Sequence, residues 1–376
     1  MYNFSLSAHT CTRVREMNKC IFRAVAGLLA AAFFMAQPVS AVSAEKALVL
    51  DGATGRVLYE KNADSRSLIA STTKIMTALI ICEQCNVLDR MRIPKEAVGI
   101  EGSSMYLTEG EVLTVQELLY GLMLRSGNDA AVALAIYCGG TVEGFAELMN
   151  DKAHILGLRD THFVNPHGLD APDHYSTARD LAILASYAMK NPIFAKTVST
   201  KEVRVGQRSL RNHNKLLWRV DGANGVKTGY TKAAGRILVS GAMRQGRQLI
   251  CVSINAPSDW EDHTKLLEEG FSRYEVKQLV YEDQLLGYQQ VAGGTAGQVE
   301  LLAAEDYFFS VSSTEVLSLE LPGYGFVYAP VAQGQSAGYA HVFLDGQPVG
   351  KIPLIYGQTV EQKQPDRKPF WKRLFS

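Results

Sequence analysis

The sequence predicts an α+β protein followed by a small all-β domain, on three observations. Short β-rich runs stand at the start of the folded chain and return from residue 225, whereas residues 88–187 mostly have the apolar spacing of helices. A sheet assembled from both ends of one domain, with helices inserted between its strands, is an α+β arrangement. From residue 275 the chain turns to short alternating runs split by Gly, Pro and Asp-Gly, a pattern typical of β-strands.

Composition bounds the size and the partners of the protein. Its 376 residues are enough for two domains of ordinary size. Hydrophobic residues make up 47% of the chain and charged residues 20%, so we expect a packed core. Lys and Arg together number 38, as do Asp and Glu, and this balance argues against a nucleic-acid partner, which needs a basic surplus.

Residues 1–44 have the pattern of a secretory signal peptide. An apolar stretch, AVAGLLAAAFFMA, is followed by small residues that offer a cut after Ala41 or Ala44, and four basic residues precede it: Arg13, Arg15, Lys19 and Arg23. An uncleaved anchor is the alternative, although the apolar run is short for a membrane span. The sequence therefore predicts export, with the mature protein working outside the cytoplasm.

The first domain, predicted over residues 45–274, begins with strands and a helix. Two β-rich runs flank Asp51-Gly52 and Thr54-Gly55, which predicts a hairpin. Residues 67–85 then have apolar spacing suited to a buried helix.

The rest of this domain is predicted to be helical first and then β-rich. Thr114 with Glu117 makes a capping box at the start of the first of four helices. These helices are expected over residues 114–127, 128–140, 141–158 and 177–190. Strands over residues 225–257 and a last helix over residues 259–274 complete the domain.

Residues 275–358 are predicted to form the small β domain, and residues 359–376 a basic, aromatic tail. Four apolar side chains of the tail share one face of a helix: Phe370, Trp371, Leu374 and Phe375. Basic residues beside an aromatic cluster suit an anionic membrane surface. The tail is either a membrane-surface anchor or a terminus that packs on the β domain.

Four cysteines follow the signal peptide: Cys82, Cys85, Cys138 and Cys251. Cys82 and Cys85 have redox-motif spacing, and export permits disulfides. However, they follow a helix and not the strand of a thioredoxin site, so we expect buried thiols or one structural bridge. Two cysteines three apart on a helix do not bridge each other comfortably.

The first stretch that could carry chemistry is STTK, from Ser71 to Lys74. Residues three apart share a helix face, so the lysine can reach the serine hydroxyl. Serine is a poor nucleophile without a base, and lysine can be that base when burial or a second cation lowers its pKa. Taken alone, the same letters also fit an exposed helix start.

Two more stretches have suitable chemistry. SGN places Ser126 and Asn128 two apart in a loop, where they could face one cleft, although Asn128 could equally cap the next helix. KTGYT places Lys227 and Thr228 on a strand, where they could hold an anionic group. Gly229 would let another backbone lie close, so a peptide could add to the sheet edge.

Ser-x-x-Lys, Ser-x-Asn and Lys-Thr-Gly, in this order, form a signature shared by penicillin-binding proteins and serine β-lactamases. With FVNPHGLDAPDHYSTARDLAILA and the stretch around KTGYT, residues 45–275 resemble the low-molecular-mass penicillin-binding proteins that act as serine-type D-alanyl-D-alanine carboxypeptidases. The resemblance implies a β-lactamase/transpeptidase-like catalytic domain, in which helices flank an antiparallel sheet. The β-rich second domain also fits this family.

The resemblance also implies the catalytic roles. Ser71 would be the acylated nucleophile, Lys74 its base, and Ser126 the relay of a proton to the leaving D-alanine. Backbone N–H groups of Ser71 and Tyr230 would form the oxyanion hole. His167 would either lie near the deacylation water or pin its loop by hydrogen bonds.

Substrate binding follows from the same resemblance. Asn128 would orient the substrate amide, Lys227 and Thr228 would bind the terminal carboxylate, and Gly229 would leave room for the peptide. The implied partners are peptidoglycan stem peptides, with β-lactams as covalent inhibitors. No metal or cofactor is implied, and the place of action would be the cell wall or the outer face of the cytoplasmic membrane.

Three other functions fit parts of the same pattern. A class A β-lactamase needs a loop glutamate, yet no glutamate occurs between Glu147 and Glu202, and the middle motif is Ser-Gly-Asn. A peptidoglycan D,D-endopeptidase is a closer rival. A wall-binding or penicillin-sensing protein with a dead site is disfavoured because all expected catalytic residues are present.

Overall fold

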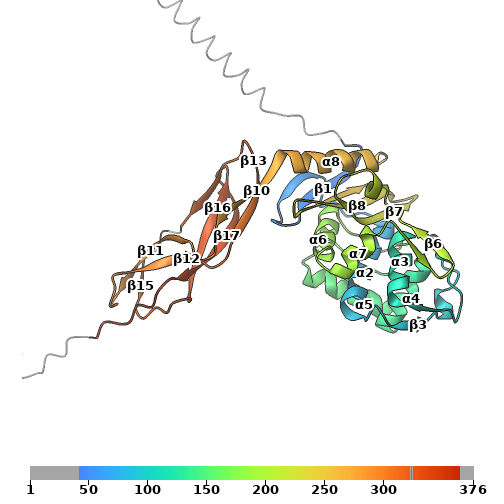
Figure 1. Cartoon of the computed structure of the whole chain (residues 1–376), viewed down its shortest axis with the longest axis horizontal. Coiled ribbons are helices and arrows are strands. Elements are labelled where there is room, and N and C mark those ends of the chain that lie inside the picture. The colour runs from blue at the N-terminus through green and yellow to red at the C-terminus, as the bar shows by residue number, and fades with distance from the viewer. Residues whose placement is uncertain (1–41, 322, 324, 365–376) are drawn as a thin grey trace, which may run out of the picture. The chain divides into compact units, whose positions relative to one another are not determined.

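The computed structural model describes residues 42–321, 323 and 325–364 (Figure 1). The expected signal peptide up to Ala41 and the tail from residue 365 lie outside the described residues.

Five antiparallel strands form the main sheet, in the order β2-β1-β9-β8-β7. They are β1 (Lys46–Asp51), β2 (Val57–Lys61), β7 (Ala223–Thr231), β8 (Gly235–Arg244) and β9 (Arg247–Ile254). β1 and β2 form the predicted hairpin, and β1 also pairs along its length with β9. The two ends of the domain thus share one sheet, which confirms the α+β prediction.

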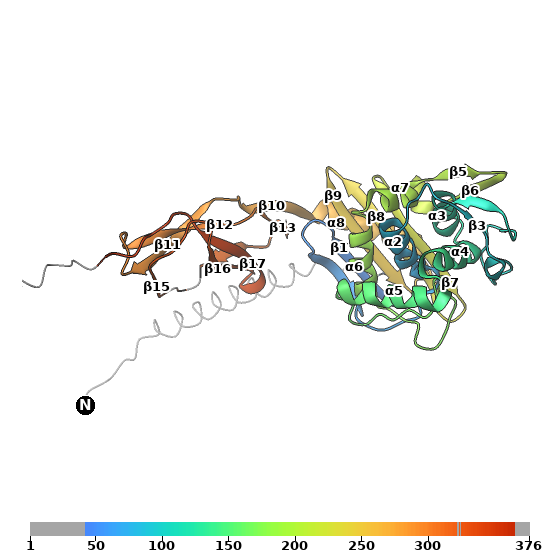
Figure 2. The same ribbon diagram turned by 90° about the horizontal axis from the view of Figure 1, so that it is seen from below.

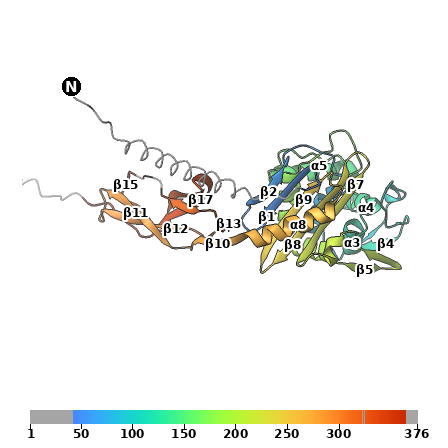
Figure 3. The same ribbon diagram turned by 90° about the horizontal axis from the view of Figure 1, so that it is seen from above.

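A block of helices is inserted between β2 and β7. It contains α2 (Lys74–Gln84), α3 (Val115–Leu124), α4 (Asn128–Gly139), α5 (Val142–Ile155), α6 (Ala178–Ala188) and α7 (Pro192–Ser199). The predicted capping box is present, since Thr114 and Glu117 each accept a hydrogen bond from the other's backbone N–H. Figure 2 shows α6 and α2 on one face of the sheet, and Figure 3 shows α8 (Asp259–Arg273) across the other.

Short elements in this block were not predicted. Two of them are strand pairs, β3 (Arg90–Arg92) with β4 (Val112–Thr114), and β5 (Glu202–Val205) with β6 (Arg208–Arg211). Three are 3-10 turns: η1 (Ala70–Thr73), η2 (Lys95–Ala97) and η3 (Lys215–Trp218). Each strand has only three or four residues, too few for an alternating pattern to stand out.

The C-terminal part is all-β, as predicted. One pair joins β10 (Tyr274–Val280) to β13 (Tyr307–Ser312). A six-stranded sheet has the order β14-β16-β17-β12-β11-β15. Its strands are β11 (Leu285–Ala292), β12 (Gln298–Ala303), β14 (Leu317–Glu320), β15 (Phe326–Tyr328), β16 (Ser336–Leu344) and β17 (Gln347–Tyr356). It has its own apolar core.

Among the described residues, no single helix is long and apolar enough to cross a membrane. α4 and α5 reach that length only together, and they are bent by 82° at their junction.

Candidate active site

The Ser-x-x-Lys motif lies where a 3-10 turn runs into a helix. Ser71 belongs to η1, and Lys74 is the first residue of α2. Their side chains meet as the sequence predicts, with Lys74 Nζ 3.0 Å from Ser71 Oγ. Ala70, just before the serine, has a positive φ of 44°, and a Cβ on Gly168 would collide with its carbonyl oxygen. The serine is therefore presented on a tight, strained turn.

Lys74 is fully buried, and two carbonyl groups fix its amine. Nζ contacts Asn128 Oδ1 at 2.7 Å and the backbone oxygen of His167 at 2.6 Å. Burial and the charge of Lys227 lower the pKa of Lys74 well below its ordinary value. A neutral amine has two N–H donors, which these carbonyl groups can accept, and its lone pair then faces the Ser71 hydroxyl.

The Ser-Gly-Asn motif joins α3 to α4, so that two of its side chains reach the same place. Asn128 does not cap α4 with its side chain; its amide is held between Lys74 and the backbone oxygen of Glu101, which accepts from Nδ2 at 2.5 Å. Ser126 has a φ of 62° and is 4% exposed. Among the described residues, its hydroxyl is the one buried side-chain polar atom without a hydrogen-bond partner. Such a group is available to a bound substrate.

Asp129, which the motifs do not include, holds the loop around Met105 by hydrogen bonds. Its carboxylate accepts hydrogen bonds from the backbone N–H groups of Met105 and Leu107 and from Ser104 Oγ, at 2.6–3.1 Å. The side chain is buried, so these contacts compensate its desolvation. An acidic residue at the start of an otherwise apolar helix was the signal that could have identified it.

Lys227 lies on β7, at the edge of the main sheet, with its side chain only 1% exposed. Its Nζ donates to the backbone oxygen of Thr228 at 2.8 Å. Burial lowers the pKa of Lys227 to about 7. The predicted role as second cation is consistent with this arrangement, because its charge is one of the causes that lower the pKa of Lys74.

Gly229 is needed for a close approach, although the neighbouring backbone belongs to this chain itself. A Cβ at Gly229 would lie 3.2 Å from the oxygen of Ile69 and 3.3 Å from the backbone nitrogens of Ser71 and Thr72. The glycine therefore lets η1, the turn that contains Ser71, press against β7. This contact places the Ser71 N–H beside the strand that carries Tyr230.

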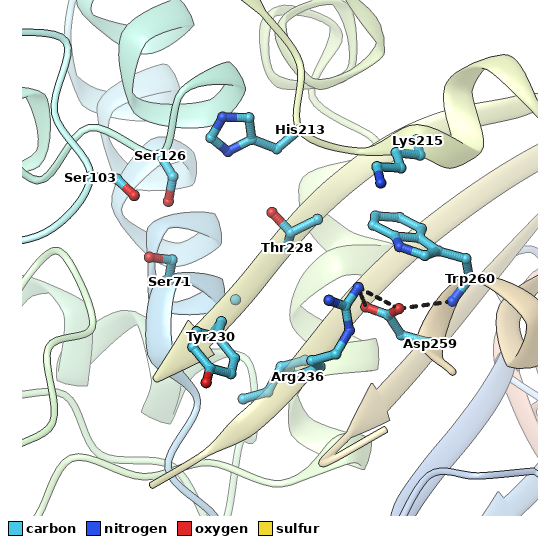
Figure 4. A pocket seen from close by; sticks show the side chains of 12 residues that line it. Ser71, Ser103, Ser126, His213, Lys215, Thr228, Tyr230, Arg236, Asp259 and Trp260 are labelled. Atoms are coloured by element: carbon cyan, nitrogen blue, oxygen red, sulfur yellow. Dashed lines mark hydrogen bonds and ion pairs between the residues drawn. The ribbon is translucent and has the colours of Figure 1, made fainter. Parts of the chain in front are cut away.

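A cavity of 340 Å³ lies beside the three motifs, as Figure 4 shows. Hydroxyl groups of Ser71, Ser126 and Thr228 border the same space, with Tyr230 at its rim and 65% exposed. Lys74, Lys227 and Asn128 are buried and do not line it. Residues that the motifs missed also line the cavity: Ser103, His213, Lys215, Arg236, Ile237, Asp259 and Trp260.

Arg236 and His213 are two cavity residues that the motifs do not include, and nearby charged groups affect both of them. Arg236 forms an ion pair with Asp259, at 2.7 Å. Desolvation at the cavity wall, with the charges of Lys227 and Arg125, lowers the pKa of His213 to about 4, although part of the residue is exposed. Arg236 follows KTGYT by five residues and His213 precedes it by fourteen, but a single histidine or ion pair gives no signal by itself.

His167 contributes its backbone and a neutral ring. Its carbonyl oxygen accepts from Lys74, and its Nδ1 accepts from the N–H of Leu169 at 3.1 Å. Burial and the charge of Lys74 lower the pKa of the imidazole to about 4. These contacts favour the expectation that His167 pins the loop.

A serine beside a buried lysine, facing the edge strand of an antiparallel sheet, defines a serine hydrolase of the penicillin-recognising kind. The profile of the peptidase S11 family, D-alanyl-D-alanine carboxypeptidase, matches residues 32–258, and that of the penicillin-binding protein 5 C-terminal domain matches residues 274–362. The chain belongs to this family of D-alanyl-D-alanine carboxypeptidases.

Individual relatives agree with this assignment. D-alanyl-D-alanine carboxypeptidase DacF of Bacillus subtilis is 34% identical over 335 residues, 85% of this chain and 86% of the relative. The crystal structure of penicillin binding protein 5 from Haemophilus influenzae superposes with a TM-score of 0.78 at 30% identity, covering 86% of this chain and 99% of that one. The crystal structure of the Streptomyces K15 DD-transpeptidase superposes with a TM-score of 0.60 at 37% identity. The match covers 62% of this chain and 98% of the transpeptidase chain.

Proposed function

We propose that this carboxypeptidase works through an acyl-enzyme on Ser71, with Lys74 as the base. The observation that supports this most is the geometry of the Lys74 amine. Two carbonyl groups take its N–H donors, and its remaining position faces Ser71 Oγ at 3.0 Å. A buried lysine of lowered pKa can accept the serine proton, and without such a base serine is a weak nucleophile.

The reaction then has two stages. Ser71 Oγ attacks the carbonyl carbon of the penultimate D-alanine while Lys74 takes its proton, and N–H groups of Ser71 and Tyr230 stabilise the oxyanion. Ser126 passes a proton to the leaving amine, and the C–N bond breaks to release D-alanine. Water then hydrolyses the ester, which frees Ser71 and the shortened peptide. The unpartnered Ser126 hydroxyl supports its role as relay.

The substrate lies along β7. Its backbone adds to the sheet edge beside Gly229, Asn128 orients its amide, and Lys227 with Thr228 binds its terminal carboxylate. The natural substrates are peptidoglycan stem peptides ending in D-Ala-D-Ala. A β-lactam acylates Ser71 in the same way and is held there, because the interval between Glu147 and Glu202 has no glutamate to activate water.

The direct test is incubation of the purified protein with a pentapeptide ending in D-Ala-D-Ala, followed by assay of free D-alanine. Release of D-alanine is expected. If penicillin labels the protein and no D-alanine appears, the chain binds the ligand without catalysing the reaction.

The pH profile should separate the two lysines. Activity rises with pH as Lys74 loses its proton, through a pKa well below the ordinary lysine value. It falls again as Lys227 passes its pKa of about 7, because the neutral amine no longer attracts the carboxylate. We expect kcat/KM to show both limbs for the pentapeptide, and an analogue with an amidated terminus to lack the falling limb. A falling limb of equal position and depth with both substrates would contradict this role for Lys227.

We propose export with cleavage after Ala41, the earlier of the two possible cuts. The backbone N–H groups of Ser43 and Ala44 both donate to Asp262 at 3.0 Å, and Ser43 Oγ does so at 2.7 Å. A cut after Ala44 would remove these contacts and leave the buried carboxylate with fewer partners. N-terminal sequencing of the exported protein should begin at Val42, and a start at Glu45 would contradict the proposal.

We also propose domain limits of 45–274 for catalysis and a β domain from residue 275, followed by a tail that contacts the membrane. The expected start of the tail at residue 359 is too early, because Val360 is buried in the β-domain core and pairs with Val331, and Gln362 pairs with Gly294. The membrane-contacting part is therefore proposed from residue 365, where basic and aromatic residues gather, and its contact should be weak and reversible because so short a segment is unstable as a helix in water. Mature protein should co-sediment with anionic vesicles at low salt, and protein lacking residues 365–376 should not. Equal pelleting of both forms would exclude the tail as an anchor.

A further inference from the structure

Two helices that carry the catalytic groups touch at both of their ends. At their N-terminal ends, Lys74 of α2 contacts Asn128 of α4 at 2.7 Å. At their C-terminal ends lie Cys85, the C-cap residue just after α2, and Cys138, the last residue but one of α4. The two helices therefore run in parallel over about 16 Å, with the catalytic contact at one end and two thiols at the other.

The two thiols lie close together at that far end. Cys138 Sγ lies 3.6 Å from Oε1 of Gln84, the residue before Cys85 in the chain, and each thiol shifts the pKa of the other. Both are partly buried, in contact with the core and accessible from outside. Cys82 and Cys251 are buried, so they are less accessible to a reagent.

The contact prepares one thiol for reaction. The hydrogen bond from Cys85 lowers the pKa of Cys138, which makes Cys138 the easier of the two to convert to a thiolate. The same contact, together with burial, raises the pKa of Cys85. Thiolates are the attacking species in disulfide exchange, so Cys138 is suited to react first.

We propose that Cys85 and Cys138 form a disulfide after export, by exchange with an external disulfide compound. The Cys138 thiolate attacks one sulfur of the donor and expels a first thiolate. Cys85 then loses its proton and attacks the mixed disulfide, which expels a second thiolate and closes the bond. The two cysteines are oxidised, the donor is reduced to two thiols, and the inference depends on the proposed location outside the cytoplasm.

The bond would fix the helix pair from the end away from the substrate. It closes the loop from residue 85 to residue 138, which contains α3 and the Ser-Gly-Asn motif. Closing a long loop restricts the unfolded chain and so stabilises the fold, provided that the native geometry accepts the bond. The bond involves none of the catalytic side chains, so it should act on thermal stability more than on kcat.

The test uses the mature protein, incubated with oxidised glutathione while folded. We expect a mass loss of about 2 Da, for the two hydrogens removed, and one cross-linked proteolytic pair that contains Cys85 and Cys138. The melting temperature should rise by about 4 °C or more, and dithiothreitol should reverse the rise. Penicillin labelling should persist in both forms, which distinguishes this result from failure of the proposed function.

Variants make the assignment specific. Cys85→Ser and Cys138→Ser should each abolish the dithiothreitol-sensitive shift, whereas the control Cys82→Ala should keep it. Peptide mapping of the unmodified chain decides the question even if a variant does not fold. A bond from Cys82 to Cys85, a bond between two molecules, or four thiols that resist oxidation would each overturn the proposal.

Discussion

Replacing Ser71 with alanine is expected to abolish both the release of D-alanine and covalent labelling by penicillin. Both reactions need the Ser71 oxygen as nucleophile, and the oxyanion donors alone leave only a small residual rate. We expect kcat/KM to fall by about 10⁴-fold or more, since removal of a nucleophile in comparable serine enzymes has effects of this order. The measurements are free D-alanine from a pentapeptide and retention of a labelled penicillin on the denatured protein.

Ser103→Ala is the matched control for this experiment. Ser103 lines the same cavity, but within the described part of the chain its hydroxyl has no lysine contact like that of Ser71 with Lys74. It should still be labelled, with a smaller change in rate. If labelling survives in a folded Ser71→Ala protein and disappears in Ser103→Ala, the nucleophile is Ser103 and the assignment of Ser71 is wrong.

Lys227→Ala should lower kcat/KM far more for substrates with a free terminal carboxylate than for their amidated analogues. A charge-assisted contact in a buried site is lost, and removing one partner of such a pair costs about 2–5 kcal/mol. This corresponds to a loss of roughly 30-fold to 1,000-fold or more in kcat/KM for the carboxylate substrate. The comparison of the two substrates on one variant is the measurement.

The comparison also separates two roles of Lys227. Its charge helps to lower the pKa of Lys74, and loss of that effect would slow both substrates alike. Equal losses would therefore mean that Lys227 acts through Lys74 and not on the carboxylate. Lys215→Ala is the control, because this exposed lysine lines the same cavity. Its replacement is expected to change kcat/KM little for either substrate.

The sequence was sufficient to predict the fold and the contact between Ser71 and Lys74. A spacing of three residues on a helix is a local constraint, so the Lys74–Ser71 contact follows from it directly. The hairpin and the three later strands are long enough for their patterns to be visible. The approach of Asn128 to Lys74 could be expected only from the family's order of motifs, since 54 residues separate them.

Other parts of the site could not be predicted because they depend on packing between distant segments. The partners of Asp129 lie more than twenty residues earlier, on a loop without a regular pattern. The sequence suggests that Gly229 makes room for a substrate. In the structure, the space that a Cβ at this position would need is bordered by the backbone of η1, a turn of the same chain. Burial, which lowers the pKa of both lysines, exists only after folding.

The position of β7 at the edge of the sheet has a consequence for self-association. An open edge is a template on which strands of other molecules can pair, and it is a common origin of aggregation. Here η1 packs on one face of β7 at Gly229, the side to which a Cβ would point, and among the described residues no strand pairs with the outer edge of β7. The edge on which we propose that a substrate peptide pairs is therefore the same edge on which a strand of a second copy would pair. An edge kept accessible for substrate binding also exposes the protein to self-association.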